Sequence, residues 1–437
     1  MKSLRLTAAA ILISMAGAAA VQARTWTLDE CIAYAIEHNL TVKGRELEMK
    51  SGELEITESK NAFLPNVSAS ASQSFNFGRG LNSQNTYENR NTSSFQWGLS
   101  ASMPLFQGLQ DVRRLKYARI NLRTLLYQHE AAKDDVTLNI ISSYLQVLYS
   151  QEVLATAEAQ VELSDYEVGR QEALAESGKI PEVDLLAARS QLEQDRLSVI
   201  NAKNDLTNSF LDLAQLMRLE SIEDFDVVPL QSTDPSIPSA AEVYDAAMSR
   251  NNSILASRNG IKAADAYISV ARAGYIPRLS LNAGLGSSYY KLNGMYNPSF
   301  GAQMRNNYST YFGFSLSIPI FDAFNTRNSI RRAKVQRLNA VLQLDQASTE
   351  LYRTIQRAYY NATGARDKYV TSLTTEEATR VAFEAMQEKY NIGRATPNEF
   401  ELSKTNLLKN TLSRISAHYE YLLRHRILLF YQGDINR

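Results

Sequence analysis

The sequence predicts a mainly α-helical chain with a smaller transmembrane β part, in which long helical hairpins occur twice and four β-strands accompany them. Three observations support this fold class. The chain contains an internal repeat, long proline-free stretches carry apolar residues at helical spacing, and four short stretches alternate apolar with small polar residues. Together they predict an elongated protein with two copies of each element.

The N-terminus has the pattern of a secretory signal. Lys2 and Arg5 precede an apolar run that ends in VQA, which predicts a signal peptide over 1–23 and an exported protein. The remainder has no run of 18 apolar residues, so no helical membrane span is expected. The one cysteine, Cys31, excludes an intrachain disulfide framework and a multi-cysteine metal site.

The repeat sets the domain organisation. TLDECIAYAIEHN at 27–39 matches SAAEVYDAAMSRN at 239–251, and SMPLF at 102–106 matches SIPIF at 317–321. We therefore expect a first repeat over 24–218, a proline-containing linker over 219–238 and a second repeat over 239–437, which fold into one unit.

Helical spacing defines the long elements. Val112, Leu115, Ala118, Leu122 and Leu125 recur every three or four residues, as in coiled-coil-like packing. The expected helices cover about 27–61, 105–176 and 182–218, then 240–273, 321–391 and 397–431. A helix of about 72 residues reaches roughly 108 Å, so two helices of about 36 residues can complement it end to end.

Alternation defines the strands, expected at 66–77, 93–103, 278–290 and 308–318. About 11 residues in a tilted strand span roughly 25 Å, the height of a membrane barrel wall. Four strands do not close a barrel, and open edges are not tolerated in lipid, so other chains must complete the wall. Two copies give eight strands and three give twelve; a conduit favours three.

Prolines are expected where strands and helices join. Pro104 is predicted to end the hydrogen-bond ladder of its strand, with Phe106 at the start of the following helix. The four expected junctions are Pro65, Pro104, Pro277 and Pro319.

Catalytic motifs are missing from the sequence. The four histidines form no HExxH, there is no GxSxG, and Gly284 and Gly286 do not precede a helix as a phosphate loop requires. Lysine and arginine balance aspartate and glutamate, at 46 each, which gives no reason to expect a nucleic-acid partner. We expect no enzyme activity, cofactor or metal.

In their order and duplication, FLP and YIP, SMPLF and SIPIF, and the turns ESGKIPEVD and NIGRATPNE resemble the TolC-like outer-membrane efflux protein family. The resemblance implies a homotrimer whose twelve strands form a barrel in the outer membrane of a Gram-negative bacterium, above a periplasmic helical tunnel. It also implies a passive channel that works with a periplasmic adaptor and an inner-membrane transporter in tripartite efflux or type I secretion.

The resemblance places the two glycine turns at the periplasmic tip, where the adaptor binds. The same residues also fit a simple helix–helix turn that binds nothing, because glycine ends one helix and proline begins the next. The implied adaptor contacts are Gly178, Lys179, Ile180, Gly393, Arg394 and Ala395.

The resemblance also implies a gate near these turns, with Glu399 at the constriction, Asp184 as a hydrogen-bonding carboxylate and Tyr390 as the gate tyrosine. Two positions depart from the family: Arg394 lies one residue before the expected arginine, and Leu402 replaces a second acid. The Thr396–Glu399 spacing equally predicts a helix capping box. In a trimer, three Glu399 carboxylates would repel one another, favour cations and raise each other's pKa.

A different class of protein, a secreted coiled-coil fibre or adhesin, also accounts for the long helices. It does not require strands of barrel length with serine on one face. Alkali or urea would release such a fibre from washed outer membranes, whereas a barrel would stay.

Overall fold

The computed structural model describes residues 24–81, 85–89, 91–219, 221, 225–230 and 236–433. The predicted signal peptide, 1–23, and parts of the predicted linker lie outside the described residues. The chain divides into two compact units. The helical unit comprises Met1–Glu46, His129–Ile254 and Ser348–Arg437, and the sheet unit comprises Leu47–Gln128 and Leu255–Ala347. Each unit therefore takes segments from both repeats.

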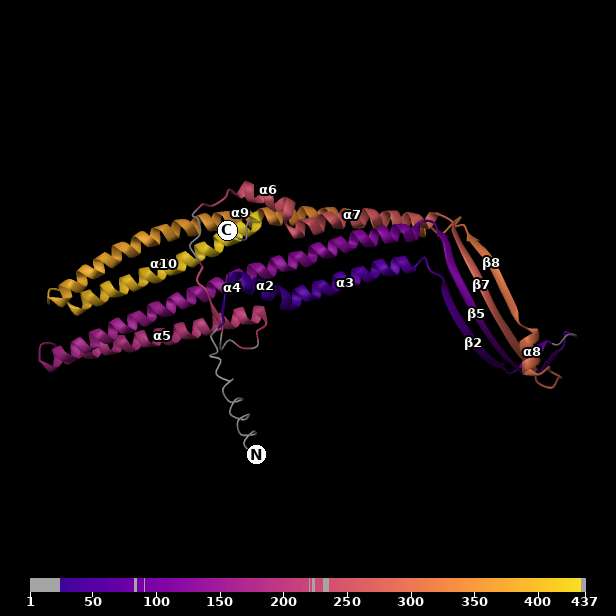
Figure 1. Cartoon of the computed structure of the whole chain (residues 1–437), viewed down its shortest axis with the longest axis horizontal. Coiled ribbons are helices and arrows are strands. Elements are labelled where there is room, and N and C mark those ends of the chain that lie inside the picture. Colours follow the sequence, from indigo (N-terminus) through magenta and orange to yellow (C-terminus); the bar gives the residue numbers. More distant parts are fainter. Residues whose placement is uncertain are drawn as a thin grey trace, which may run out of the picture. The chain divides into compact units, whose positions relative to one another are not determined.

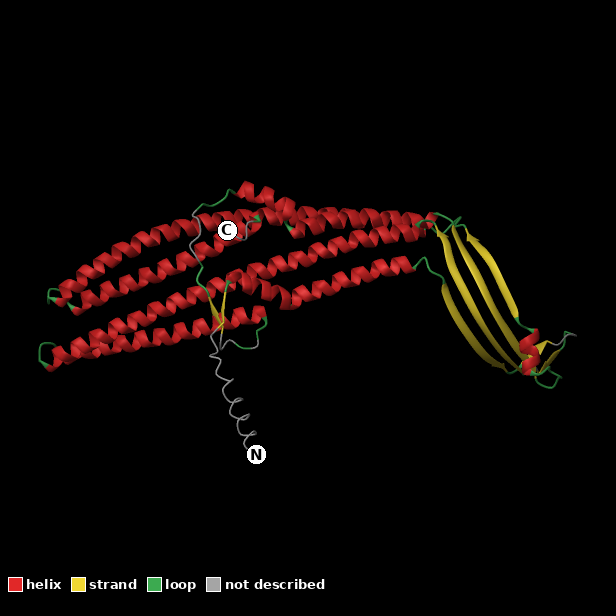
Figure 2. Ribbon diagram, viewed as in Figure 1, coloured by secondary structure: helices red, strands yellow, loops and turns green. Residues whose placement is uncertain are grey.

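The sheet unit contains the four predicted strands (Figures 1 and 2). They are β2 (Asn66–Asn76), β5 (Thr92–Gln107), β7 (Arg278–Leu292) and β8 (Ser309–Ser317), joined antiparallel in the order β2-β5-β7-β8. The mainly helical fold with four main strands is thus confirmed. A short hairpin, β3 (Arg79–Leu81) with β4 (Tyr87–Asn89), and the helix α8 (Phe300–Asn306) lie in the segments that connect the predicted strands.

The register of the sheet separates its two faces. Trp97 of β5 lies opposite Ala71 of β2, and Ala283 of β7 lies opposite Phe312 of β8, all on a mainly apolar face. Neighbouring positions place small polar residues on the other face, where Ser68 and Ser100 hydroxyls lie 2.9 Å apart. The period-two pattern therefore gives one apolar and one small-polar face.

The prediction that the second strand ends at Pro104 is wrong. β5 continues to Gln107, and the register shifts between Pro104 and Phe106, which leaves an extra residue as in a β-bulge. Leu105 is the position left out of the ladder, and β2 pairs with β5 only as far as Ser102, so the strand accommodates a proline without an amide donor next to the bulge. The helix α4 (Gln110–Glu176) begins three residues after the strand ends.

Gly108 forms the tight connection between β5 and α4. Its φ is +62°, and a Cβ at this position would lie 2.7 Å from Ile276 Cβ and 3.0 Å from the Ala273 carbonyl oxygen. In the second repeat, Ala323 and Phe324 take the same left-handed backbone, with φ of +52° and +65°, before α9 (Asn325–Asn391). The other junction prolines, Pro65, Pro277 and Pro319, lie between elements as expected.

Four helical segments of the sheet unit pack in the same order as the strands. Gly52 of α3 (Leu40–Asn61) faces Leu122 and Leu125 of α4. The rings of Tyr117 on α4 and Tyr267 on α7 (Asn252–Arg272) are 5.4 Å apart. Beyond the 3₁₀ turn η1 (Ala273–Tyr275), the start of α9 packs against Gly274 through Thr326, which completes the order α3-α4-α7-α9.

The single helices expected over 27–61 and 240–273 are each two helices. α2 (Leu28–His38) ends at Asn39, and α6 (Ala240–Arg250) ends at Asn251, where the backbone is extended. Each asparagine side chain accepts a hydrogen bond from the next helix, Asn39 from Thr41 N–H and Asn251 from Ile254 N–H. Asparagine thus ends one helix and caps another, which hydrophobic spacing alone did not reveal.

The helical unit contains α2, α6, α5 (Glu182–Met217), α10 (Pro397–Gln432) and most of α4 and α9. Its main core surrounds Tyr144, which is fully buried. The Tyr144 hydroxyl lies 3.0 Å from the Trp26 carbonyl oxygen and 2.6 Å from that of Val228. It anchors a parallel pair, β1 (Arg24–Trp26) with β6 (Phe225–Val227), which the sequence did not predict.

Among the described residues, no helix has the length and apolar character needed to cross a membrane.

Candidate functional site

Two hairpin turns close one end of the helical unit, and both use a left-handed glycine. Gly178 follows α4 with φ +69°, and Gly393 follows α9 with φ +74°. Lys179 and Arg394 donate their backbone N–H groups to Leu174 and Lys389 carbonyls in the 6→1 pattern of a Schellman cap. The Lys179 and Arg394 side chains are exposed, and the turn residues are those that the sequence indicated.

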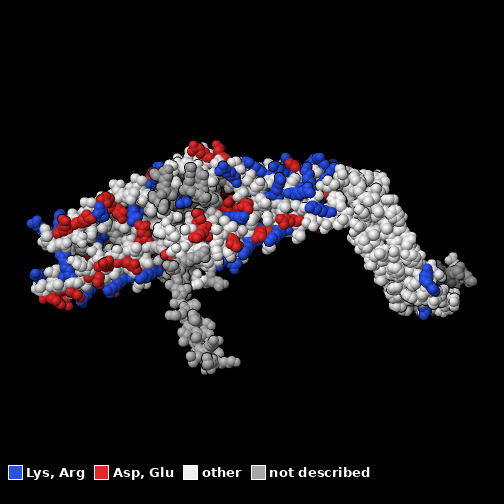
Figure 3. Space-filling view, viewed as in Figure 1, with Lys and Arg blue, Asp and Glu red and all other residues white. Residues whose placement is uncertain are grey.

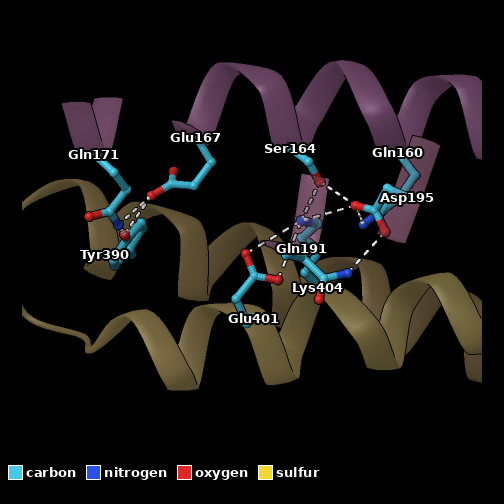
Figure 4. Close-up of polar contacts among 9 residues, drawn as sticks. All are labelled: Gln160, Ser164, Glu167, Gln171, Gln191, Asp195, Tyr390, Glu401 and Lys404. Carbon is cyan, nitrogen blue, oxygen red and sulfur yellow. Dashed lines mark hydrogen bonds and ion pairs between the residues drawn. The ribbon is translucent and has the colours of Figure 1, made fainter. Parts of the chain in front are cut away.

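Behind these turns, Tyr390 of α9 joins α4 through a polar cluster (Figure 4). The buried Tyr390 hydroxyl donates to the Glu167 carboxylate at 2.5 Å, and Gln171 Nε2 donates to the hydroxyl oxygen at 2.6 Å. Arg170 lies over the Tyr390 ring at 4.2 Å and donates to its backbone carbonyl at 3.0 Å. The ring stacks on Phe400 at 4.5 Å. We name Tyr390, Glu167, Gln171, Arg170 and Phe400 the tyrosine cluster.

The electrostatics of the tyrosine cluster keep the phenol protonated. Burial, followed by the hydrogen bond and charge of Glu167, raises the pKa of Tyr390 well above its ordinary value. The hydroxyl therefore remains a donor to the buried carboxylate over the physiological range. The contact holds α9 against α4 close to the turns.

A second cluster lies at the next turns of the helices and centres on a buried lysine (Figure 4). Lys404 of α10 is 2% exposed, and its Nζ donates to Ser164 Oγ of α4 at 2.7 Å. It also lies 3.3 Å from Glu401 and 3.8 Å from Asp195 of α5, which is itself buried. We name Lys404, Ser164, Asp195, Glu401, Gln160 and Gln191 the lysine cluster.

Asp195 is the main acceptor of the lysine cluster. Ser164 Oγ donates to its carboxylate, as do Gln191 at 2.9 Å and Gln160 at 3.4 Å. This network of hydrogen bonds and charge offsets the desolvation of both ions. Burial raises the pKa of Glu401, and Lys404 opposes that shift. The lysine cluster therefore links α4, α5 and α10 through groups that are costly to separate.

A pocket of about 500 Å³ opens between the two hairpins beside these clusters. Asp184, Gln191, Tyr390, Pro397 and Glu401 are among its lining residues. The pocket shows that the two hairpins are not fully packed at this end of the unit.

The predicted gate residues take different positions around this pocket. Tyr390 lies in the tyrosine cluster, and Asp184 lines the pocket, while the Tyr390 hydroxyl donates to Glu167 rather than to Asp184. Glu399 is exposed and forms the capping box with Thr396, whose backbone N–H and hydroxyl lower the Glu399 pKa. Arg394 is exposed in its turn.

The sequence reasoning did not identify the lysine cluster or Glu167. One signal was present: Lys404 interrupts an apolar stripe between Phe400 and Leu407, where a charged side chain needs a buried partner. Among the described residues, no group of three or more His, Cys, Asp or Glu side chains is arranged to hold a metal ion.

Known proteins share the sequence pattern and the fold of this chain. A family described as "Outer membrane efflux protein" matches residues 32–217 and 243–431, one segment in each repeat. The outer membrane protein TolC of Escherichia coli K12 is 23% identical over 400 residues, which cover 87% of this chain and 77% of TolC. The alkaline protease secretion protein AprF of Pseudomonas aeruginosa is 22% identical and covers 80% of this chain and 72% of AprF.

Among solved structures, the CmeC outer membrane channel of Campylobacter jejuni superposes with a TM-score of 0.76. The match covers 93% of this chain and 86% of CmeC at 19% identity, so it supports the fold. The resemblance found in the duplicated motifs is confirmed. Because the family match covers most of both repeats, the chain belongs to the outer membrane efflux protein family and is an outer-membrane channel protein of efflux and secretion systems.

Proposed function

We propose that three copies of this chain close a twelve-stranded barrel and a helical tunnel, and that this channel passively conducts substrates delivered by an inner-membrane transporter and a periplasmic adaptor. The observation that carries the proposal is the four-stranded sheet, whose edge strands are β2 and β8. In lipid, edge strands must pair, and the β8 edge of one copy can pair with the β2 edge of the next.

The faces of the sheet support a membrane wall around a wet lumen. Phe312, Phe314 and Leu316 are between 62% and 68% exposed on the apolar face of β8. A lipid environment would cover these side chains, whereas water would leave a large apolar patch exposed. The serine-rich face suits a water-filled interior.

We assign the hairpin turns of the helical unit to adaptor binding. The two turns have the same cap geometry and expose one cation each, Lys179 and Arg394. This repetition offers a periplasmic partner two similar binding positions in each copy. Photo-crosslinkers at Lys179 and Arg394 should capture the same adaptor, whereas an exposed position far from the turns, such as Tyr360, should not.

We further propose that the tyrosine and lysine clusters hold the channel closed. Both join different hairpins, so opening by outward movement of one hairpin must separate buried polar groups. In the proposed trimer, the three Glu399 carboxylates would lie around the channel axis, where they would restrict the passage of ions and favour cations. Arg394 and Asp184 are the neighbouring candidates for contacts that change on opening.

The experiment for the proposed function measures membrane retention, assembly and conductance of the full chain. Washed outer membranes should keep the protein after alkali and urea, and it should migrate as a trimer unless boiled. The purified trimer should form ion-conducting pores in planar bilayers. Release by alkali together with no conductance would overturn the proposal and favour a peripheral fibre.

A further inference from the structure

Charge is distributed unevenly between the two units. The chain has a net charge of zero, yet the sheet unit carries 20 Lys and Arg against 9 Asp and Glu, a net charge of +11. The helical unit, counted over the full sequence, carries the compensating −11. Long-range electrostatics of the two units therefore have opposite signs.

Within the sheet unit, most of the positive charge lies on the helices beside the strands (Figure 3). β2, β5 and β8 contain no charged residue, and β7 contains Arg278 and Lys291. The first 19 residues of α4 contain five cations and only Asp111 as an acid. Residues 325–347 of α9 contain five cations and only Asp345, so the charge begins close to where the uncharged strands end.

The charge of α4 changes sign along the helix. After its cationic start, residues 129–176 contain ten acids and two cations. A surface built for an anionic substrate moving along the helix would continue the cations. Confinement of the cations to the strand-adjacent part of the helix instead indicates an anionic partner located there.

Exposed cations occur on both α4 and α9. Lys116, Arg119 and Arg123 recur on α4 at intervals of three and four residues, and all are exposed. On α9, Arg331, Arg332 and Lys334 are exposed in the same way. We name these six residues the basic belt.

Acids on neighbouring helices neutralise only part of the charge. Arg337 of α9 pairs with Asp265 of α7 at 2.7 Å. Residues 47–61 of α3 contribute four glutamates and two lysines, and these acids are included in the net charge of +11. The α3 segment is thus net negative, and the excess positive charge beside the strands lies on α4, α7 and α9.

We propose that the basic belt binds the headgroups of anionic phospholipids at the membrane surface where the strands enter the helical layer. The inference rests on the proposed function, because it requires the strands, whose charged residues lie near the ends of β7, to be in the membrane. Lysine or arginine near an anionic lipid surface contributes about 1 kcal/mol per residue, so each cation removed should weaken the preference for anionic lipid about fivefold at low salt.

Native mass spectrometry of the detergent-purified full-length protein tests the proposal. Phosphatidylglycerol and phosphatidylcholine with the same acyl chains are titrated, and the preference for the anionic lipid is measured. Two variants remove belt charge: Arg331→Gln/Lys334→Gln on α9, and Lys116→Gln/Arg119→Gln/Arg123→Gln on α4. The matched control is Arg353→Gln/Arg357→Gln, two exposed cations on the helical-unit part of α9.

The expected result is a clear preference for phosphatidylglycerol that decreases in both belt variants, decreases with added salt, and persists in the control. An equal decrease in the control, or no decrease in the belt variants, overturns the proposal. Competition by soluble glycerol phosphate at the same concentrations would assign the site to free phosphate and also overturn it.

Conductance of the same preparations separates the remaining outcomes. If the belt variants shift anion selectivity and leave lipid preference unchanged, the cations line the conduction path and the lipid proposal fails. If the wild type conducts but shows no lipid preference, this inference fails and the proposed channel stands. Absence of both conductance and membrane retention would reject the proposed function itself.

Discussion

Lys404 Nζ lies 2.7 Å from Ser164 Oγ, although 240 residues separate the two positions in the chain. The lysine is 2% exposed and belongs to the second repeat, whereas the serine belongs to the first. The contact therefore joins the two hairpins through a buried charge whose carboxylate neighbours, Asp195 and Glu401, come from α5 and α10.

Replacement of Lys404 should destabilise the helical unit and favour opening. Lys404→Met leaves the buried Asp195 carboxylate without its cation, at a cost of about 3 kcal/mol. We expect a lower thermal midpoint and a higher resting conductance. The measurements are thermal unfolding and single-channel recording of the trimer.

Lys409→Met is the matched control for this change, because Lys409 is exposed on the same helix. Asp195→Asn together with Lys404→Met should recover much of the lost stability, since both charges are then gone. Equal thermal midpoints for Lys404→Met and Lys409→Met would contradict the proposal that Lys404 helps to hold the two hairpins together.

Removal of the Tyr390 hydroxyl should weaken the second connection between the hairpins. Tyr390→Phe keeps the ring on Phe400 but takes away the donor to the buried Glu167 carboxylate. A hydrogen bond to a charged group contributes about 1.5–3 kcal/mol. We expect a corresponding loss of stability in thermal unfolding and more frequent channel opening in single-channel recordings of the trimer.

Tyr360→Phe on the same helix serves as the comparison, because Tyr360 is 68% exposed. It should leave both readouts unchanged. If the Tyr390→Phe channel opens as rarely as the wild type, the tyrosine cluster does not hold the channel closed.

Glu399 can be tested against a second capping box in the same chain. Glu399 caps α10 with Thr396, and Glu242 caps α6 with Ser239 in the same way. Alanine at either position should weaken its helix N-terminus similarly. Only Glu399→Ala should reduce cation preference and change conductance, because only Glu399 is proposed to face the axis. Unchanged ion selectivity in Glu399→Ala would reject the constriction.

Cys31 should be unreactive in the folded protein up to high pH. Burial, followed by the charge of Glu30, raises the pKa of this thiol to about 12 from an ordinary value near 9.0. The thiolate is the nucleophile, so a thiol reagent at pH 9 should label the unfolded chain quickly and the native chain slowly. Rapid native labelling would show that the core around Cys31 opens.

The raised pKa of Cys31 also determines the direction in which folding stability changes with pH. Between pH 9 and about 12 the unfolded thiol loses its proton while the folded thiol keeps it, so the stability contributed by Cys31 decreases as pH rises. Cys31→Ala should reduce the slope of stability against pH in this range. An unchanged slope would assign the alkaline loss of stability to other groups, such as Tyr390, whose pKa is also raised.

The sequence alone determined the repeated plan, the long helices, the four strands and the glycine turns. These features are local: alternation places Trp97 and Leu99 on one face, and glycine at 178 or 393 supplies the left-handed backbone that a hairpin turn needs. It also indicated Tyr390 as a polar contact near the turns, through the family resemblance.

Only the tertiary structure decided which side chains meet. Spacing placed Phe400, Lys404 and Leu407 on one helix face but gave no partner for the lysine, because Ser164 and Asp195 lie on helices far away in the chain. The bulge after Pro104 likewise depends on the neighbouring strand. The breaks at Asn39 and Asn251 are instead local caps, which hydrophobic spacing alone does not reveal. Periodicity fixes the direction of each side chain around its own axis, whereas packing between elements fixes its partner.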